Sequence, residues 1–231
     1  MQGSDVNGYI KEELKNLSEP KYREFSSKLL PGTENVLGVR LPHLRNLAKE
    51  ISKGDWKGYL KNACDDSFEE IMIQGLVIGY AKAEPSEIIS ALKDFIQKID
   101  NWSVCDSTVM GLKAAAKNQK VFFDFAKKYI ENDREFFIRF GAVMLLAHFV
   151  NAEYIDRVLL LLDSVKHDGY YAKMAIAWAV SVCYVKFPKE TLVFFKKCSL
   201  DDWTFNKSIQ KIKESFRVSA EDKAMLEKMK R

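Results

Sequence analysis

The sequence predicts an all-α protein built from repeated helical hairpins. Hydrophobic residues recur at helical spacing in nearly every segment, and no segment sustains the alternation of apolar and polar residues that a strand would show. Helix openings also recur with a constant period of 34 residues, which is typical of a solenoid of stacked hairpins. The residues at these openings are Phe68, Trp102, Phe136, Tyr170 and Thr204.

Residues that are favoured at helix N-termini support several of the predicted helix starts. Proline lacks the backbone N–H that the first turn of a helix leaves unpaired, so it is favoured at an opening. Four prolines stand at such places: Pro20, Pro42, Pro85 and Pro188. Ser67 followed by Glu70 has the spacing of a capping box, and Pro31–Leu41 is expected to be the one extended loop. The predicted helices span residues 8–17, 20–30, 42–52, 55–62, 68–82, 85–98, 102–117, 119–131, 134–149, 153–165, 169–186, 188–197, 203–216 and 219–230.

Length and composition favour a soluble protein with a sizeable core. Of the 231 residues, 47% are hydrophobic and 29% are charged. We expect a single helical repeat domain over residues 1–231, with disorder through about Asn7. No apolar run reaches the roughly 18 residues of a membrane helix, and the N-terminus lacks a signal pattern. A cytoplasmic monomer is therefore expected.

The spacing of the cysteines and histidines, and the absence of common catalytic motifs, argue against several classes of enzyme. The four cysteines have no CxxC spacing and are expected to be reduced, mostly buried thiols: Cys64, Cys105, Cys183 and Cys198. The three histidines are scattered, so neither a metal nor a cofactor is expected. The chain has no GxSxG, P-loop or HExxH motif.

The distribution of charge points weakly to a polyanionic partner. The net charge is only +4, but Lys186–Arg231 holds twelve basic and seven acidic residues. Arg139, Lys173 and Lys207 also occupy the same place in three successive repeats. Stacked repeats would align them as a positive stripe, for which DNA phosphates are a natural ligand. The alternatives are a solvated lysine-rich face and cations that merely cap or pair with acidic neighbours.

Two tryptophans could take part in a binding site. Trp102 and Asp106 are four residues apart, so a helix places them on one face, where an indole and a carboxylate together suit a cationic ligand. The alternative is an ordinary core indole and an exposed acid. Trp178 lies in a very apolar helix, where a core role is the default. Core-like places of the repeat hold Met110, Met144, Trp178 and Ile212.

Four segments stand out by their order and separation: LGVRLPHLRNLAKEI (Leu37–Ile51), DNWSVCDS (Asp100–Ser107), FFIRFGAVMLL (Phe136–Leu146) and KMAIAWAV (Lys173–Val180). Together they resemble the AlkD-type DNA alkylation repair proteins, which are HEAT-like helical-repeat DNA glycosylases. The resemblance covers about residues 5–217. It implies a right-handed superhelical solenoid whose concave face binds double-stranded DNA, and hence association with the nucleoid.

The resemblance also implies an activity, the excision of N3- or N7-alkylated purines by hydrolysis of the N-glycosidic bond. Asp106 would stabilise the developing sugar cation and position a water, and Trp102 and Trp178 would flank the deoxyribose. DNA-binding roles would fall to Arg139, Lys173, Lys207 and Arg45. The resemblance thus implies a carboxylate set between two indoles in a cationic groove.

Two departures from the family pattern leave three functions open. Phe140 stands where the family commonly has an arginine, and Ser181 and Val182 stand where it often has an Arg-Glu pair. The first hypothesis is a monofunctional alkylpurine DNA glycosylase. The second is a catalytically silent DNA-binding protein of the same family, for unusual or damaged DNA. The third is a protein-binding HEAT-type scaffold.

Overall fold

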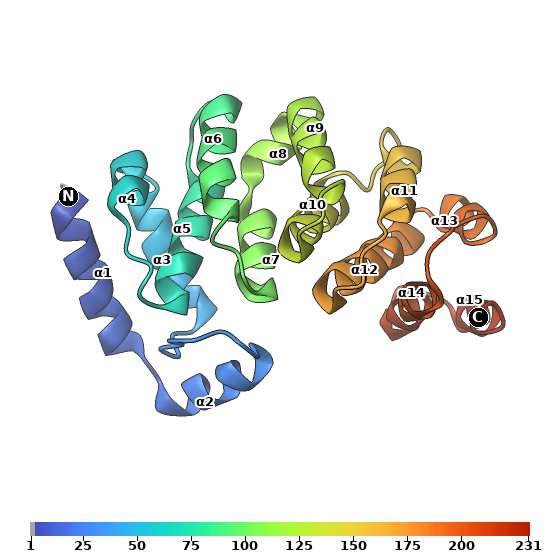
Figure 1. The fold of residues 1–231 in the computed structure, drawn as a ribbon, viewed down its shortest axis with the longest axis horizontal. Coiled ribbons are helices and arrows are strands. Elements are labelled where there is room, and N and C mark those ends of the chain that lie inside the picture. The colour runs from blue at the N-terminus through green and yellow to red at the C-terminus, as the bar shows by residue number, and fades with distance from the viewer. Residues whose placement is uncertain (1–2) are drawn as a thin grey trace. The chain divides into compact units, whose positions relative to one another are not determined.

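The computed structural model describes residues 3–231, with side chains from Val6 onward, and all regular secondary structure in this part of the chain is helical. Fifteen helices make up 72% of these described residues, and no strand occurs among them. No helix within the described range combines the length and the apolarity needed to cross a bilayer. The helices group into two compact units that meet in sequence between Asn118 and Gln119 (Figure 1). The expectation of a single domain stays a prediction.

Unit 1 is organised around three consecutive packed helices. Helix α3 packs against α5, and α5 packs against α7, while α1 covers α4. The middle helix, α5, is buried over nearly its whole length. The helices of this unit are α1 (Gly3–Leu17), α2 (Pro20–Leu29), α3 (Leu41–Ile51), α4 (Trp56–Asn62), α5 (Phe68–Tyr80), α6 (Pro85–Ile96), α7 (Trp102–Gly111) and α8 (Lys113–Lys117).

Unit 2 repeats the same pattern. Helix α10 packs against α9 and α12, and α12 packs in turn against α14. Helices α10 and α12 are buried over most of their length. The helices of this unit are α9 (Gln119–Ile130), α10 (Glu135–His148), α11 (Ile155–Ser164), α12 (Tyr170–Lys186), α13 (Pro188–Phe195), α14 (Asp202–Glu214) and α15 (Ala220–Glu227).

Most predicted helix bounds agree with the structure to within a few residues, and the predicted punctuation is present. Each of the four prolines lies in the first two positions of its helix. The hydroxyl of Ser67 accepts the Glu70 N–H at 3.3 Å and donates to the Glu70 carboxylate at 2.9 Å. This pair caps α5, as its spacing predicts.

Three expectations differ from the structure. Helix α1 begins at Gly3, where disorder was expected; Val6 is buried and the Asn7 amide donates to the Asn62 carbonyl, whereas residues 1 and 2 lie outside the described part. The predicted helix over 102–117 breaks at Leu112, whose ψ of 77° is not helical. Met110 was expected in the core but is 46% exposed, because it lies on the outer face of α7.

The loop between α2 and α3 is held by a buried carboxylate. Glu69, 1% exposed, accepts the backbone N–H groups of Leu37, Gly38 and Val39 at 2.7–3.1 Å. Gly38 has φ 87°, and an added Cβ would lie 2.6–2.7 Å from atoms of Arg23. Only glycine satisfies both constraints, so this position fixes the path of the loop.

We expect Glu69→Ala to destabilise the protein by about 3 kcal/mol, because it leaves the buried N–H groups of Gly38 and Val39 and the half-buried N–H of Leu37 without an acceptor. The measurement is the free energy of unfolding from urea titration. The control is Glu24→Ala, which removes an exposed carboxylate paired with the exposed Lys28 and should cost less than about 1 kcal/mol. Equal losses in the two variants would contradict the anchoring role of Glu69.

Candidate functional site

Trp102 and Asp106 lie one turn apart at the start of α7. The side chain of Asn101 caps this helix by accepting the Val104 N–H at 3.0 Å, which sets the first turn. The indole N–H of Trp102 donates to the Leu29 carbonyl at the end of α2, at 3.0 Å. The orientation of the ring is therefore fixed by a contact between segments 73 residues apart in the chain.

The two residues belong to an exposed strip along α7. Trp102, Asp106 and Met110 are four residues apart in turn and are half-buried or exposed, whereas Cys105 and Val109 are fully buried. We call the partly exposed residues from Trp102 to Gly111 the α7 strip. Because Cys105 lies on the opposite, buried face, its thiol is not available to a ligand that approaches the strip.

The three predicted cations lie on consecutive packed helices of unit 2, in different surroundings. Arg139 on α10 is only 5% exposed and donates to the Tyr171 carbonyl of α12 at 3.1 Å. Lys173 pairs with Asp201 at 3.1 Å, and Lys207 donates to a glutamine of its own helix. Two of the three cations are therefore engaged with the adjacent helix.

Lys173 and Lys207 come together at Trp203. Their ammonium groups lie 5.7 and 5.5 Å from the centre of the Trp203 ring, which is 39% exposed. Tyr170, 56% exposed, packs edge-on against the same ring at 5.9 Å. The sequence analysis did not single out Trp203 and so missed this cluster. The recurrence of aromatic residues at helix openings was the available signal.

Trp178 and Arg45 are both accessible. Trp178 is half-buried, although its neighbours Ala177 and Ala179 are fully buried, so its indole lies at the edge of the core. Arg45 is exposed on α3. Phe140 is fully buried and packs edge-on against Phe125 and Tyr129, so position 140 belongs to the core of unit 2.

One side-chain cluster has the composition of a metal site. Cys64, Asp66 and Glu70 place ligand atoms within 4.8 Å of one another. Lys11 pairs with Asp66 at 2.8 Å, and Ser67 donates to Glu70. These partners satisfy two of the three groups without an ion. All four cysteines are free thiols, and burial raises the pKa of Cys183 to about 12.

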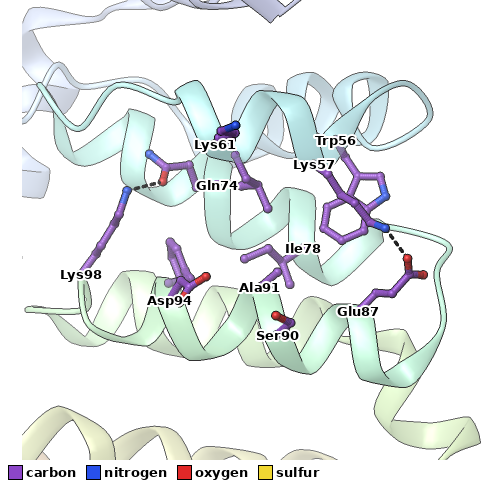
Figure 2. Close-up of a pocket in the computed structure, with 12 residues that line it drawn as sticks. Trp56, Lys57, Lys61, Gln74, Ile78, Glu87, Ser90, Ala91, Asp94 and Lys98 are labelled. Atoms are coloured by element: carbon purple, nitrogen blue, oxygen red, sulfur yellow. Dashed lines mark hydrogen bonds and ion pairs between the residues drawn. The ribbon is translucent and has the colours of Figure 1, made fainter.

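Unit 1 has a pocket of about 430 Å³ between α4, α5 and α6 (Figure 2). Its apolar side is formed by residues such as Trp56 and Ile78, and its rim is charged. Two cations of the rim are paired with carboxylates: Lys57 contacts Glu87, and Lys98 contacts Asp65 at 2.8 Å. The charges at this pocket therefore largely neutralise one another.

Asp201 caps helix α14 and also forms an ion pair with Lys173. Burial alone would raise the pKa of the Asp201 carboxyl, but hydrogen bonds from Thr204 and the ion pair with Lys173 outweigh burial and hold the pKa below its ordinary value. A carboxyl whose pKa is lowered by folding stabilises the fold above its unfolded pKa of about 3.9. That contribution is lost as the pH falls through the folded pKa.

We expect Asp201→Asn to lower the free energy of unfolding by up to about 1 kcal/mol at pH 7, because asparagine still caps the helix but cannot pair with Lys173. The difference from wild type should begin to shrink as the pH falls below about 4, and it should vanish below the lowered pKa of the folded carboxyl, where wild-type Asp201 is protonated as well. Urea titrations at pH 7 and pH 3 measure it. Asp133→Asn, in an exposed turn, is the control. A difference that does not change with pH would exclude a role for the charge of Asp201.

Comparison with known proteins agrees with these features. Residues 10–212 match the sequence model of a family described as DNA alkylation repair enzyme. No curated protein matches the chain. The family match covers most of the sequence, including both units, and supports a role in DNA repair. The chain therefore belongs to the DNA alkylation repair enzyme family.

Proposed function

We propose that this protein is a monofunctional DNA glycosylase that releases N3- or N7-alkylated purines from double-stranded DNA. The observation that carries the proposal is the pair Trp102 and Asp106, one turn apart on the accessible α7 strip of a DNA alkylation repair protein. An indole face and a carboxylate side by side suit a ligand that is positively charged or becomes so.

The chemistry of alkylated purines fits this pair. Alkylation at N3 or N7 gives the purine a positive charge, so the base leaves as a neutral molecule and needs no strong acid. The electron pair of the N-glycosidic bond goes to the base, and the deoxyribose becomes an oxocarbenium ion. A water then adds to C1′ and loses a proton. In the proposal, Asp106 stabilises the sugar cation and orients the water.

Preorganisation supports the assignment of Trp102. Its indole N–H is already bonded to the Leu29 carbonyl, so the ring need not be reoriented when DNA binds. A ring held in place can stabilise a cation over its face without first losing side-chain freedom. Trp178 is assigned the same kind of contact with the deoxyribose, which its partial exposure allows.

Unit 2 is proposed to bind the DNA backbone. Lys173, Lys207, Trp203 and Tyr170 combine cations with exposed aromatic rings, and this combination suits phosphates and sugars. Arg139 would act partly by fixing the start of α12, through its hydrogen bond to the Tyr171 carbonyl. The proposed setting is a right-handed, HEAT-like superhelical solenoid with a DNA-binding concave face, which the 34-residue period and the family support.

We expect Asp106→Asn to slow base release at least about 100-fold, because the amide keeps the shape of the carboxylate but not its charge. Release of 7-methylguanine or 3-methyladenine from methylated duplex DNA is measured under single-turnover conditions. Asp94→Asn, on the exposed face of α6, should match wild type. Unchanged release by Asp106→Asn, or no release by wild type, would refute the proposal.

A second candidate function is DNA binding without excision. It is favoured by the buried Phe140 and by Ser181, which is also buried and donates to the Trp178 carbonyl. Neither position offers DNA the polar group that the family commonly has there. This function requires DNA affinity that falls steeply with salt and no base release.

We expect Lys173→Gln combined with Lys207→Gln to reduce the slope of log affinity against log salt by about 2, because each phosphate contact contributes about 0.9. Fluorescence anisotropy with a short duplex at several salt concentrations gives the slope. Lys128→Gln combined with Lys189→Gln removes the same charge from exposed positions of unit 2 and should leave it unchanged. A slope equal to that of wild type would exclude Lys173 and Lys207 from the interface.

A further inference from the structure

We propose that a lysine pocket at the far end of the α7 strip binds phosphate groups of the DNA backbone. The pocket has a volume of about 540 Å³ and lies where α3 and α5 end and α8 begins. It is lined by Lys49, Lys53, Lys82 and Lys113 around the ring of Tyr80, and we call this group the lysine pocket. The inference rests on the proposed function, because it names DNA as the ligand.

The charge of the lysine pocket is uncompensated. No carboxylate lines it, and within the described part of the chain none of its four lysines forms an ion pair. The pocket in Figure 2 lies in the same unit and differs in this respect, because Lys57 there pairs with Glu87. Four ammonium groups around one hollow repel one another, and an anionic ligand would relieve that repulsion.

Tyr80 holds two of the lysines in place. The ammonium groups of Lys49 and Lys113 lie 5.9 and 6.0 Å from the centre of its ring, so both make cation–π contacts with the same aromatic ring. An ammonium group has three N–H donors and no acceptor. The matching ligand is therefore an anion with several acceptor oxygens, and the phosphodiester is the group of this kind that the proposed substrate supplies.

Close helix packing builds the pocket. A Cβ added to Gly79 would lie 3.0–3.1 Å from the backbone carbon and oxygen of Gly111, so these glycines let the ends of α5 and α7 touch. The contact brings Tyr80 beside Gly111, and the break at Leu112 then directs the chain to Lys113. The cluster thus depends on three separate elements that meet at one place.

The spacing along α7 suits a duplex. Trp102 and Gly111 are nine residues apart on one helix, which corresponds to about 13 Å. The major groove of B-DNA is about 12 Å wide. One strand can therefore lie at Trp102 and Asp106 while phosphates of the other strand reach the lysine pocket. Arg45, exposed one turn before Lys49 on α3, extends the same basic surface.

The test removes three lysines of the pocket together, as Lys49→Gln, Lys82→Gln and Lys113→Gln. Duplex affinity is measured by anisotropy across a salt series. We expect the dissociation constant near 0.1 M salt to rise at least tenfold. The slope of log affinity against log salt should become smaller by about 2 to 3.

The matched control is Lys57→Gln, Lys61→Gln and Lys93→Gln, which removes the same charge from α4 and α6 of the same unit. Its affinity and slope should stay close to those of wild type. Thermal unfolding of both triple variants checks that each is folded.

Each outcome bears on the inference separately from the glycosylase activity. If the pocket variant binds duplex like the control, the inference is overturned. It is also overturned if wild type does not bind duplex. A third contrary outcome is that inorganic phosphate binds wild type but not the variant while the two bind duplex equally, because the pocket would then bind a free anion and not DNA. If wild type binds duplex through these lysines but releases no base, the inference holds and the glycosylase proposal fails.

Discussion

Packing between alternate helices within each unit is the constraint on which the other features depend. In unit 1 it joins α3, α5 and α7, and in unit 2 it joins α10, α12 and α14. Helix α5 is buried on almost every side and α12 over about half of its residues, so neither can slip along its axis without opening the core. Side chains at the helix ends, such as Trp102 and Tyr80, are thereby held at fixed places.

The same packing gives several charged groups two roles. Arg139 donates to the Tyr171 carbonyl while Glu135 of the same helix accepts the Tyr171 N–H at 2.6 Å, so α10 holds the first turn of α12 from both sides. Lys173 pairs with Asp201, which caps α14. These contacts stabilise unit 2 and also place cations beside exposed aromatic rings. The lysine pocket differs, since its lysines have no partner of this kind within the described chain.

Local features of the fold could be predicted from the sequence, and long-range ones could not. Helix bounds follow from periodicity and caps, and the Trp102–Asp106 pair follows from helical spacing alone. Glu69 was missed because its backbone partners lie about 30 residues away and an isolated glutamate indicates a surface position. The repeat register could not show that Met110 faces outward. The partnership of Trp178 with Asp106 stays a prediction.

In the proposed reaction, Trp102 and Asp106 act as one unit on a positively charged lesion. The most direct measurement is single-turnover release of 7-methylguanine from duplex DNA by wild type, Trp102→Phe, Asp106→Asn and the double variant. We expect each single variant to be slower than wild type and the double variant to be little slower than Asp106→Asn, because residues that act together lose their effect together. Losses that simply multiply, or a wild type that releases no base, would contradict it.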